Sequence, residues 1–379
     1  MRMLRVKYNK LFVTDNTKIA CIHRQIGRVI MELKGKKVMV VGTGISGIGA
    51  IDLLNKAGAD CIIYDANEKL TEEAVAKKLN GNKAQIIIGE LADDITEKVE
   101  LLVISPGVPV DSPLVKKFEE AGVPVWGEIE LAYNYDKGRI IAITGTNGKT
   151  TTTALVGQIV KAYNEQTYVV GNIGNSYTGE VLKTSENSYT VAEISSFQLE
   201  TVHRFHPVVS AILNITQDHL NRHHTMECYA HTKERIAENQ TKDDVCVLNM
   251  EDEELYRFGS ECKASVVWFS SKRKPDKGAY LDGDDIRYTD GTQDKLMLNI
   301  HDMNLLGTHN YENVCAAIAM TKAVGIPDDI IIEQVKCFKA VEHRIEYVAT
   351  KKGVWYYNDS KGTNPEASVK AIEAMVRPT

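Results

Sequence analysis

Two short glycine-containing loops have the residue types and the spacing needed to bind phosphate groups. The first reads Gly42-Thr-Gly-Ile-Ser-Gly47, and the second reads Gly145-Thr-Asn-Gly-Lys-Thr150. Glycines let backbone N–H groups approach a phosphate closely, and the N-terminus of a following helix adds partial positive charge. Both loops therefore predict binding of a nucleotide or another phosphorylated ligand.

The second loop (145–150) has the chemistry of a P-loop, although one glycine is missing. The usual pattern requires a glycine five residues before Gly148, and this chain has Ile143 there. A buried-strand pattern over 140–143 and a helical pattern over 151–163 still place the loop between a strand and a helix. In that position Lys149 would neutralise the β- and γ-phosphate oxygens, and Thr150 would bind Mg²⁺.

The first glycine loop (42–47) matches the dinucleotide fingerprint. It follows an apolar run, opens a helical pattern and precedes Asp65 by about twenty residues. The residues leave three alternatives open: an NAD or FAD site, a site for another diphosphate ligand, or a structural turn. An NAD-dependent dehydrogenase is therefore one alternative function for the chain.

Potential metal ligands follow other predicted strands near the P-loop. Glu193 lies at the end of one predicted strand, and Asp218 and His219 follow another. Because the carboxyl ends of parallel strands meet at the ligand-binding edge of an open α/β sheet, these residues could reach a metal beside the P-loop. A solvated loop residue is the plain alternative at each position. Lys233, in a helix-like run, is on its own a surface lysine.

Two α/β units are needed to position these residues. Short apolar runs alternate with helical patterns from Lys37 onward, which is typical of doubly wound sheets. We expect a Rossmann-like N-terminal domain over 31–135 and a central P-loop ATPase α/β domain over 136–340. The expected strands are 38–41, 61–64, 86–88 and 101–105 in the first domain, and 140–143, 189–194, 208–215, 245–248 and 266–269 in the second.

The end of the central domain and the remainder of the chain show further patterns. A polar hairpin is expected over 278–300, with turns at Asp282-Gly283 and Asp290-Gly291, followed by a helix over 309–324 that ends at Gly325. Two strands, 344–349 and 354–358, and a helix over 365–375 come next. About 40 residues are fewer than the roughly 50 of a small domain. We therefore expect 341–379 to begin a truncated C-terminal domain, and a nucleotide-binding fragment without turnover is a second alternative function.

Composition excludes several classes of protein. The 379 residues are 43% hydrophobic and 25% charged with a net charge of −6, which is typical of a globular protein and argues against nucleic acid as a partner. No apolar run reaches the roughly 20 residues that span a bilayer. Seven scattered cysteines without a C-x-x-C pair indicate reduced thiols. We expect a cytoplasmic monomer with no membrane partner. A basic extension over 1–30 should precede its first domain.

Taken together, the motifs resemble those of the Mur ligases, ATP-dependent amide-forming enzymes whose shortened P-loop reads G-T-N-G-K-[S/T]. The resemblance runs from about Lys34 to the end of the chain. Within the family, Glu193-Ile-Ser-Ser-Phe-Gln-Leu-Glu200 is similar to the branch that adds D-glutamate to UDP-N-acetylmuramoyl-L-alanine. The resemblance implies that the first glycine loop holds the uridine diphosphate of that substrate. A folate polyglutamate ligase, from the same superfamily, does not begin with a dinucleotide-like domain.

The resemblance also implies a reaction and a role for individual residues. The partners are UDP-N-acetylmuramoyl-L-alanine, D-glutamate and ATP, and an acyl phosphate is the intermediate. Lys233 is expected to be carbamylated by CO₂, which converts an ammonium group into an oxygen anion suited to Mg²⁺. The implied catalytic residues are Lys149, Lys233 and Lys361. The implied ATP-binding residues are Gly145, Thr146, Asn147, Gly148, Lys149, Thr150, Thr151, Asn310, Asn313, Arg344 and Asp359. The implied UDP-substrate residues are Gly44, Ile45, Ser46, Asp65 and Asn172. The implied ligands of two Mg²⁺ ions are Thr150, Glu193, His219 and Lys233.

Overall fold

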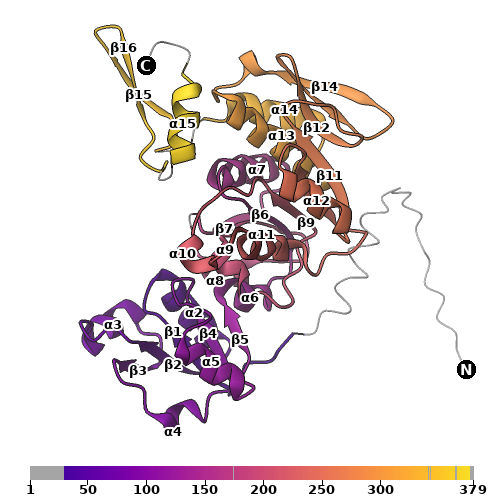
Figure 1. Cartoon of the computed structure of the whole chain (residues 1–379). Helices are drawn as coiled ribbons and strands as arrows, with labels where there is room; N and C mark the ends of the chain where they lie inside the picture. Colours follow the sequence, from indigo (N-terminus) through magenta and orange to yellow (C-terminus); the bar gives the residue numbers. More distant parts are fainter. Residues whose placement is uncertain (1–29, 174, 340, 342, 363–364, 376–379) are drawn as a thin grey trace, which may run out of the picture. The chain divides into compact units, whose positions relative to one another are not determined.

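The computed structural model describes residues 30–173, 175–339, 341, 343–362 and 365–375. From Leu33 onward these residues contain two sheets made mainly of parallel strands, and a separate two-stranded antiparallel sheet (Figure 1). The expected α/β class is therefore confirmed. The predicted N-terminal extension lies almost wholly outside the described residues.

The first sheet has five parallel strands in the order β3-β2-β1-β4-β5. Its strands are β1 (Lys37–Val41), β2 (Asp60–Asp65), β3 (Gln85–Ile88), β4 (Leu101–Ile104) and β5 (Val125–Gly127). Its helices are α2 (Ile45–Lys56), α3 (Glu72–Leu79), α4 (Asp93–Thr96) and α5 (Pro113–Glu120). The strand order reverses between β1 and β4, so the loops after these strands meet at a switch point where ligands bind. The three-residue β5 was not predicted, because so short a strand has no measurable periodicity.

The second sheet has nine strands in the order β14-β13-β12-β11-β10-β9-β6-β8-β7. Its parallel strands are β6 (Arg139–Thr144), β7 (Thr167–Gly171), β8 (Tyr189–Glu193), β9 (Val209–Ile212), β10 (Val245–Asn249), β11 (Ser265–Ser270) and β12 (Gly278–Asp282). β13 (Asp285–Thr289) and β14 (Asp294–Asn299) are antiparallel. The predicted turns at Gly283 and Gly291 join β12–β13 and β13–β14, and both glycines have positive φ. β7 was missed because it is the edge strand and only one of its five residues is buried.

Helices also surround the second sheet, although the first of them contacts β4 and β5 of the first sheet. They are α6 (Glu128–Tyr133), α7 (Lys149–Tyr163), α8 (Tyr177–Glu180), α9 (Ser196–Leu199), α10 (Leu220–His223), α11 (Met226–Glu234), α12 (Glu253–Glu261), α13 (Thr308–Ala323) and α14 (Asp328–Cys337), with 3-10 turns at Val181–Lys183, Arg235–Ala237 and Ile300–Asp302. α7, α13 and α14 pack together in one hydrophobic core with alternate residues of the strands, such as Ile141 and Ile143. The intervening residues Ile140 and Ala142 are also buried, as a parallel sheet covered on both faces requires.

The last described segment holds the two predicted strands and the predicted helix. β15 (Glu346–Lys351) pairs with β16 (Val354–Asn358), and α15 (Pro365–Glu373) follows. Most side chains of the two strands are exposed.

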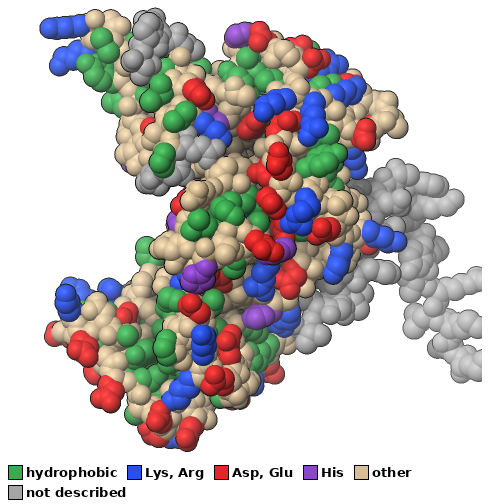
Figure 2. Space-filling model, in the orientation of Figure 1, with side chains coloured by type: hydrophobic (Ala, Val, Ile, Leu, Met, Phe, Trp, Pro, Cys, Tyr) green, Lys and Arg blue, Asp and Glu red, His purple; other side chains and the backbone are tan. Residues whose placement is uncertain are grey.

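On the face drawn in Figure 2, basic and acidic side chains are mixed and are not gathered into one basic area. No helix among the described residues is long and apolar enough to cross a membrane.

Candidate functional site

The P-loop connects β6 to α7, the strand–loop–helix arrangement that its sequence predicted. Gly148 is the N-cap of α7 and has a φ of 83°. A Cβ at this position would come 2.3 Å from Asn313 Oδ1. Only glycine therefore permits both the left-handed backbone and the close approach of α13.

Lys149 folds back over its own loop. Its Nζ donates hydrogen bonds to the carbonyl oxygens of Gly145 (2.9 Å) and Thr146 (2.8 Å). Burial lowers the pKa of Lys149, the Glu193 carboxylate opposes that shift, and the nearby Arg344 adds to it. A phosphate oxygen at this loop would be a stronger partner for the ammonium group than a neutral carbonyl.

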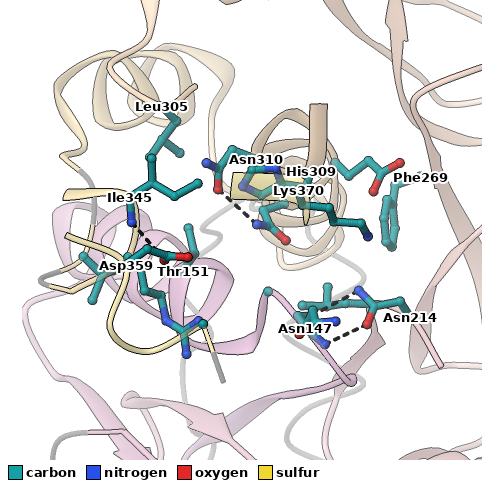
Figure 3. A pocket seen from close by; sticks show the side chains of 17 residues that line it. Asn147, Thr151, Asn214, Phe269, Leu305, His309, Asn310, Ile345, Asp359 and Lys370 are labelled. Carbon is teal, nitrogen blue, oxygen red and sulfur yellow. Dashed lines mark hydrogen bonds between the residues drawn. The ribbon is translucent and has the colours of Figure 1, made fainter. Parts of the chain in front are cut away.

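An asparagine after β9 fixes the backbone of the P-loop. The Asn147 N–H donates to Asn214 Oδ1 (2.8 Å), and Asn214 Nδ2 donates to Asn147 O (3.1 Å), as Figure 3 shows. Sequence reasoning did not select Asn214 as a site residue. The available signal was its place directly after a buried strand of the sheet that carries the P-loop.

Glu193 places an unpaired carboxylate oxygen beside this loop. The residue ends β8 and is 1% exposed. Its Oε1 accepts a hydrogen bond from Asn172 Nδ2 (2.8 Å), whereas its Oε2 has no partner among the described residues. Because an isolated buried carboxylate oxygen is unfavourable, this atom fits a bound cation. The predicted substrate residue Asn172 thus contacts a predicted metal ligand.

Lys233 is buried, so the surface-lysine alternative is wrong. The side chain is 1% exposed and its Nζ donates to Gly145 O (2.9 Å), the carbonyl that Lys149 also uses. The Nζ lies 4.5 Å from the ring centroid of Tyr229. Burial holds the pKa of Lys233 well below its usual range, Lys149 lowers it further, and Asp218 partly opposes the shift.

His219 lies in the turn before α10 with a left-handed backbone, at φ 53°. Its ring packs 4.9 Å from that of Phe197, and its Nδ1 lies 3.5 Å from Asp218 Oδ1. In the part of the chain that the structure describes, no three His, Cys, Asp or Glu side chains form a metal-binding group. A metal between Glu193 and His219 would therefore need ligands of other kinds, such as the Thr150 hydroxyl or a modified Lys233.

A pocket adjoins the P-loop and combines residues from distant parts of the chain. Its lining includes the predicted residues Asn147, Gly148, Thr151, Asn310, Asn313, Arg344 and Asp359. It also includes Asn214 and residues that sequence reasoning missed: Phe269, Leu305, His309 and Lys370 (Figure 3). Of these, only His309 had a local signal, because it directly precedes Asn310.

Hydrogen bonds hold the predicted pocket residues in place. Asn313 Nδ2 donates to Asn310 Oδ1 (3.3 Å), so the two lie on one face of α13 as their spacing predicted. Arg344 Nη2 donates to Thr150 Oγ1 (3.1 Å), and Asp359 Oδ1 accepts from the Ile345 N–H (3.1 Å). Lys361, by contrast, is exposed and does not line the pocket.

The first glycine loop lies at the other predicted position, between β1 and α2. Gly42 has a φ of 102°, and a Cβ there would meet Ser105 Oγ at 2.6 Å. Gly44 is the N-cap of α2 without a side-chain cap, and Ile45 beside it is 84% exposed, while Ser46 is half-buried. The loop therefore presents open backbone to solvent at the start of a twelve-residue helix.

Asp65, at the end of β2, bonds directly to this loop. Its Oδ2 accepts hydrogen bonds from Thr43 N (3.0 Å) and Thr43 Oγ1 (2.8 Å), and its Oδ1 accepts from Asn67 N (3.0 Å). Burial opposes ionisation of Asp65, but these bonds and the charge of Lys78 together hold its pKa below the usual value. Asp65 therefore supports the loop as an anion.

Family models match both glycine loops. The N-terminal domain model of MurD-like Mur ligases matches residues 36–127, and the Mur ligase middle domain model matches residues 143–321. The first glycine loop falls in the former range and the P-loop in the latter. The comparison thus assigns both loops to one kind of enzyme, and it does not support the dehydrogenase alternative.

Named relatives resemble the chain over most of its length. UDP-N-acetylmuramoylalanine–D-glutamate ligase from Lachnospira eligens is 79% identical over 349 residues, which are 92% of this chain and 78% of that protein. The enzyme of the same name from Lachnoclostridium phytofermentans is 53% identical, over 91% of this chain and 76% of the relative. The one from Clostridioides difficile is 45% identical, over 92% and 77%.

Solved structures share the fold at low sequence identity. The UDP-N-acetylmuramate:L-alanyl-gamma-D-glutamyl-meso-diaminopimelate ligase (MPL) of Neisseria meningitides has a TM-score of 0.56 at 18% identity, and the match covers 81% of this chain and 99% of that one. MurF ligase of Thermotoga maritima, in complex with ADP, has a TM-score of 0.53 at 18% identity, over 92% and 74%. On the family models and the named relatives, this chain belongs to the Mur ligase family.

Proposed function

We propose that this chain is the ATP-dependent ligase that joins D-glutamate to UDP-N-acetylmuramoyl-L-alanine in peptidoglycan precursor synthesis. Relatives up to 79% identical bear the name of that activity. The observation that carries the proposal in the structure is the meeting of Lys149, the half-satisfied carboxylate of Glu193 and the buried Lys233 around one P-loop.

The reaction is an acid–amino-acid ligation in two steps. A carboxylate oxygen of the L-alanyl group attacks the γ-phosphorus of ATP, the bond from that phosphorus to the β–γ bridging oxygen breaks, and ADP leaves. The neutral amine of D-glutamate then attacks the carbonyl carbon of the acyl phosphate. The bond from this carbon to the phosphate oxygen breaks, phosphate leaves, and the nitrogen loses a proton to form the amide.

The residues of the P-loop act by position and charge. The backbone N–H groups of the P-loop and the start of α7 would bind phosphate oxygens, and Lys149 would exchange its carbonyl partners for the γ-phosphate. Arg344 already bonds to Thr150 at the base of the loop, so its guanidinium is close enough to offset further phosphate charge. We assign Asn310 and Asn313 to the adenosine side of the pocket and Asp359 to the ribose.

Mur ligases use ATP together with Mg²⁺, and the described residues fit that ion. Glu193 Oε2, which has no partner among the described residues, is a hard oxygen ligand, and the Thr150 hydroxyl is a second one. When bound, Mg²⁺ supplies charge neutralisation for the phosphate groups. We propose a second Mg²⁺ site with Glu193, His219 and Lys233 as ligands, in which Lys233 is carbamylated.

The environment of Lys233 supports the carbamate. Only the neutral amine reacts with CO₂, and burial lowers the pKa of Lys233 well below its usual range. The nitrogen lone pair forms a bond to the carbon of CO₂, a proton leaves to solvent, and a carbamate anion replaces the ammonium group. The anion would also remove the repulsion between Lys233 and Lys149.

The remaining assignments concern the substrate and the setting of the enzyme. We propose that Gly44, Ile45, Ser46 and Asp65 hold the uridine diphosphate and that Asn172 lines the path of the sugar-peptide. We also propose that Lys361 acts on the reacting carboxylate when the substrates are bound. The six cysteines within the described residues are free thiols, which agrees with a cytoplasmic enzyme. We expect it to act as a monomer.

Product analysis tests the proposal. The chain is incubated with ATP, Mg²⁺, UDP-N-acetylmuramoyl-L-alanine and D-glutamate, and the released phosphate and the ligated product are measured by colorimetry and mass spectrometry. We expect equal amounts of phosphate and product, and neither when one substrate is left out or L-glutamate replaces D-glutamate. The proposal would be contradicted if phosphate were released at the same rate without the UDP-sugar. It would also be contradicted if NAD displaced bound UDP.

A further inference from the structure

One exposed lysine reaches from a neighbouring helix to the first glycine loop. Lys78 lies in the last turn of α3, and α3 packs beside α2 (Figure 1). Its Nζ donates to the carbonyl oxygen of Thr43, within the loop, at 3.4 Å. The contact is long and its acceptor is neutral, so a charged oxygen could replace that acceptor with a gain in bonding.

The charges around the first glycine loop favour a cation such as Lys78 beside it. Asp65 contributes a negative charge that bonds to Thr43 directly below the loop. A diphosphate adds two or more negative charges, whereas a helix N-terminus offers only about half an elementary charge. A positively charged side chain beside the loop would offset part of the repulsion between the ligand and Asp65.

Lys78 differs in its pairing from half of the ten other lysines from Lys34 to Lys117. Five of them form ion pairs with carboxylates: Lys36 with Glu100, Lys37 with Asp60, Lys56 with Asp52, Lys98 with Asp94, and Lys117 with Asp93. No described carboxylate lies within 4.0 Å of Lys78, although its charge does help to keep Asp65 ionised. Its ammonium group is thus held near the loop without a carboxylate partner of its own.

We propose that the ammonium group of Lys78 binds the phosphate oxygens of the nucleotide-sugar at the first glycine loop. The inference rests on the proposed function, because that function supplies the diphosphate. Lys78 would then contribute to substrate affinity. The motif of the loop does not reveal this role, because Lys78 lies 35 residues from Thr43 in the sequence.

Binding measurements on the full chain separate this role from a general surface charge. Affinities for UDP, uridine and ATP are measured for the wild type and for Lys78→Ala, Lys78→Arg and Lys77→Ala, with ligand-observed NMR for the weak ligands. Lys77 is the matched control, because it is exposed on the same turn of α3 and its side chain forms no hydrogen bond with the described residues. Lys78 is exposed, so its replacement should leave the fold intact.

We expect Lys78→Ala to weaken UDP binding about ten- to a hundredfold, which is typical of one lost hydrogen bond to a charged group. Uridine and ATP should bind as before, Lys78→Arg should keep most of the affinity, and Lys77→Ala should match the wild type. Equal affinity of Lys78→Ala and wild type for UDP would overturn the inference and leave the proposed function intact. Equal losses for UDP and uridine would also overturn it. A wild type that does not bind UDP would instead overturn the proposed function, and this inference with it.

Discussion

Two buried lysines share one carbonyl oxygen at the centre of the site. Lys149 and Lys233 both donate to Gly145 O at 2.9 Å. Two ammonium groups this close repel each other, and burial adds a desolvation penalty to each charge. The pKa of each lysine is lowered, and that of Lys233 falls further. This difference agrees with the roles that we propose, in which Lys149 binds phosphate as a cation and Lys233 reacts as a neutral amine.

The role of Lys149 can be tested against a second lysine of α7. Lys149→Ala should abolish ATP-dependent phosphate release, because Lys149 is the one lysine in the sequence of the P-loop and we propose that it binds the γ-phosphate. It should leave UDP affinity unchanged, because we propose that UDP binds at the first glycine loop. Lys161→Ala, at an exposed position of the same helix, should behave as the wild type in both assays. Normal turnover in Lys149→Ala would contradict the P-loop assignment.

The proposed carbamylation of Lys233 has a direct spectroscopic signature. With ¹³C-labelled bicarbonate, the wild type should show a carbamate carbon signal in the NMR spectrum, and Lys233→Ala should not. Activity should be lost in Lys233→Ala and partly restored by formate, which supplies a small carboxylate in the space of the carbamate. Lys161→Ala should keep both signal and activity. An active wild-type enzyme that contains only unmodified lysine would show that Lys233 acts in another way.

His223 predicts how stability depends on pH. Burial lowers the pKa of His223 from 6.5 to about 4, and the charges of Arg222 and of Lys233 in its unmodified form contribute to the shift. Because the unfolded chain then binds more protons than the folded chain between these values, the free energy of unfolding should fall as the pH drops from about 6.5 to about 4. Above pH 6.5 the contribution is fully present, since both states are neutral.

The variant His223→Gln isolates this contribution. Urea unfolding of the wild type and the variant is measured between about pH 6.5 and pH 4. The free energy of unfolding should decrease less with falling pH in His223→Gln, even if that variant is less stable at every pH. Other acids titrate in the same range in both proteins, so the difference between the two slopes is the quantity that matters. Parallel curves would mean that His223 is not held neutral by the fold.

At the scale of elements, the site depends on loops that follow neighbouring parallel strands. The P-loop follows β6, Glu193 ends β8 and Asn214 follows β9, and these three strands are adjacent in the sheet. α13 closes the group from the side through Asn313, which packs against Gly148. The geometry of the P-loop thus depends on a helix that starts 160 residues after it in the sequence.

Two glycines with the same φ angle allow the effect of backbone strain to be distinguished from the effect of a side-chain clash. Gly148 and Gly325 both have a φ of 83°, but a Cβ at Gly148 would meet Asn313, whereas one at Gly325 would meet nothing within 4 Å. Gly325→Ala should lower the free energy of unfolding by about 1–2 kcal/mol, as a left-handed alanine requires, and should leave ATP affinity unchanged. Gly148→Ala should be less stable than Gly325→Ala and should lose ATP binding. Calorimetry and chemical unfolding measure both quantities, and similar effects of the two substitutions would contradict the argument.

At the scale of the whole molecule, ATP should connect segments that contribute little to the hydrophobic core. Most side chains of β15 and β16 are exposed, yet Arg344 and Asp359 beside them line the pocket that adjoins the P-loop. ATP should therefore increase hydrogen-exchange protection over 343–362 and over the P-loop, with no change in β1–β4. Arg344→Ala should remove most of the gain in 343–362. An ATP effect spread evenly over all peptides would indicate general stabilisation instead.

The local sequence determined the parts of this protein that depend on near neighbours in the chain. Residue type and spacing predicted both glycine loops, most strands of the two sheets and the helix that begins with Thr308. The Mur ligase family was identified from the resemblance of the motifs to those of known enzymes. Backbone conformation at Gly42 or Gly148 and burial of a strand such as 140–143 follow from short-range sterics and hydrophobic patterning, which a sequence displays directly. The edge strand β7 and the three-residue β5 escaped prediction because their patterns are too weak or too short.

The tertiary structure alone decided which side chains complete the site. Lys233 is buried because it reaches Gly145, 88 residues away, and Asn214 supports Asn147 across 67 residues. Phe269 and Leu305 line the pocket, whereas Lys361 is exposed. No local sequence pattern predicts these positions. Strand order determines which loops become neighbours, and burial and pKa depend on those neighbours. For that reason the sequence identified the phosphate-binding loops, while the fold selected their partners.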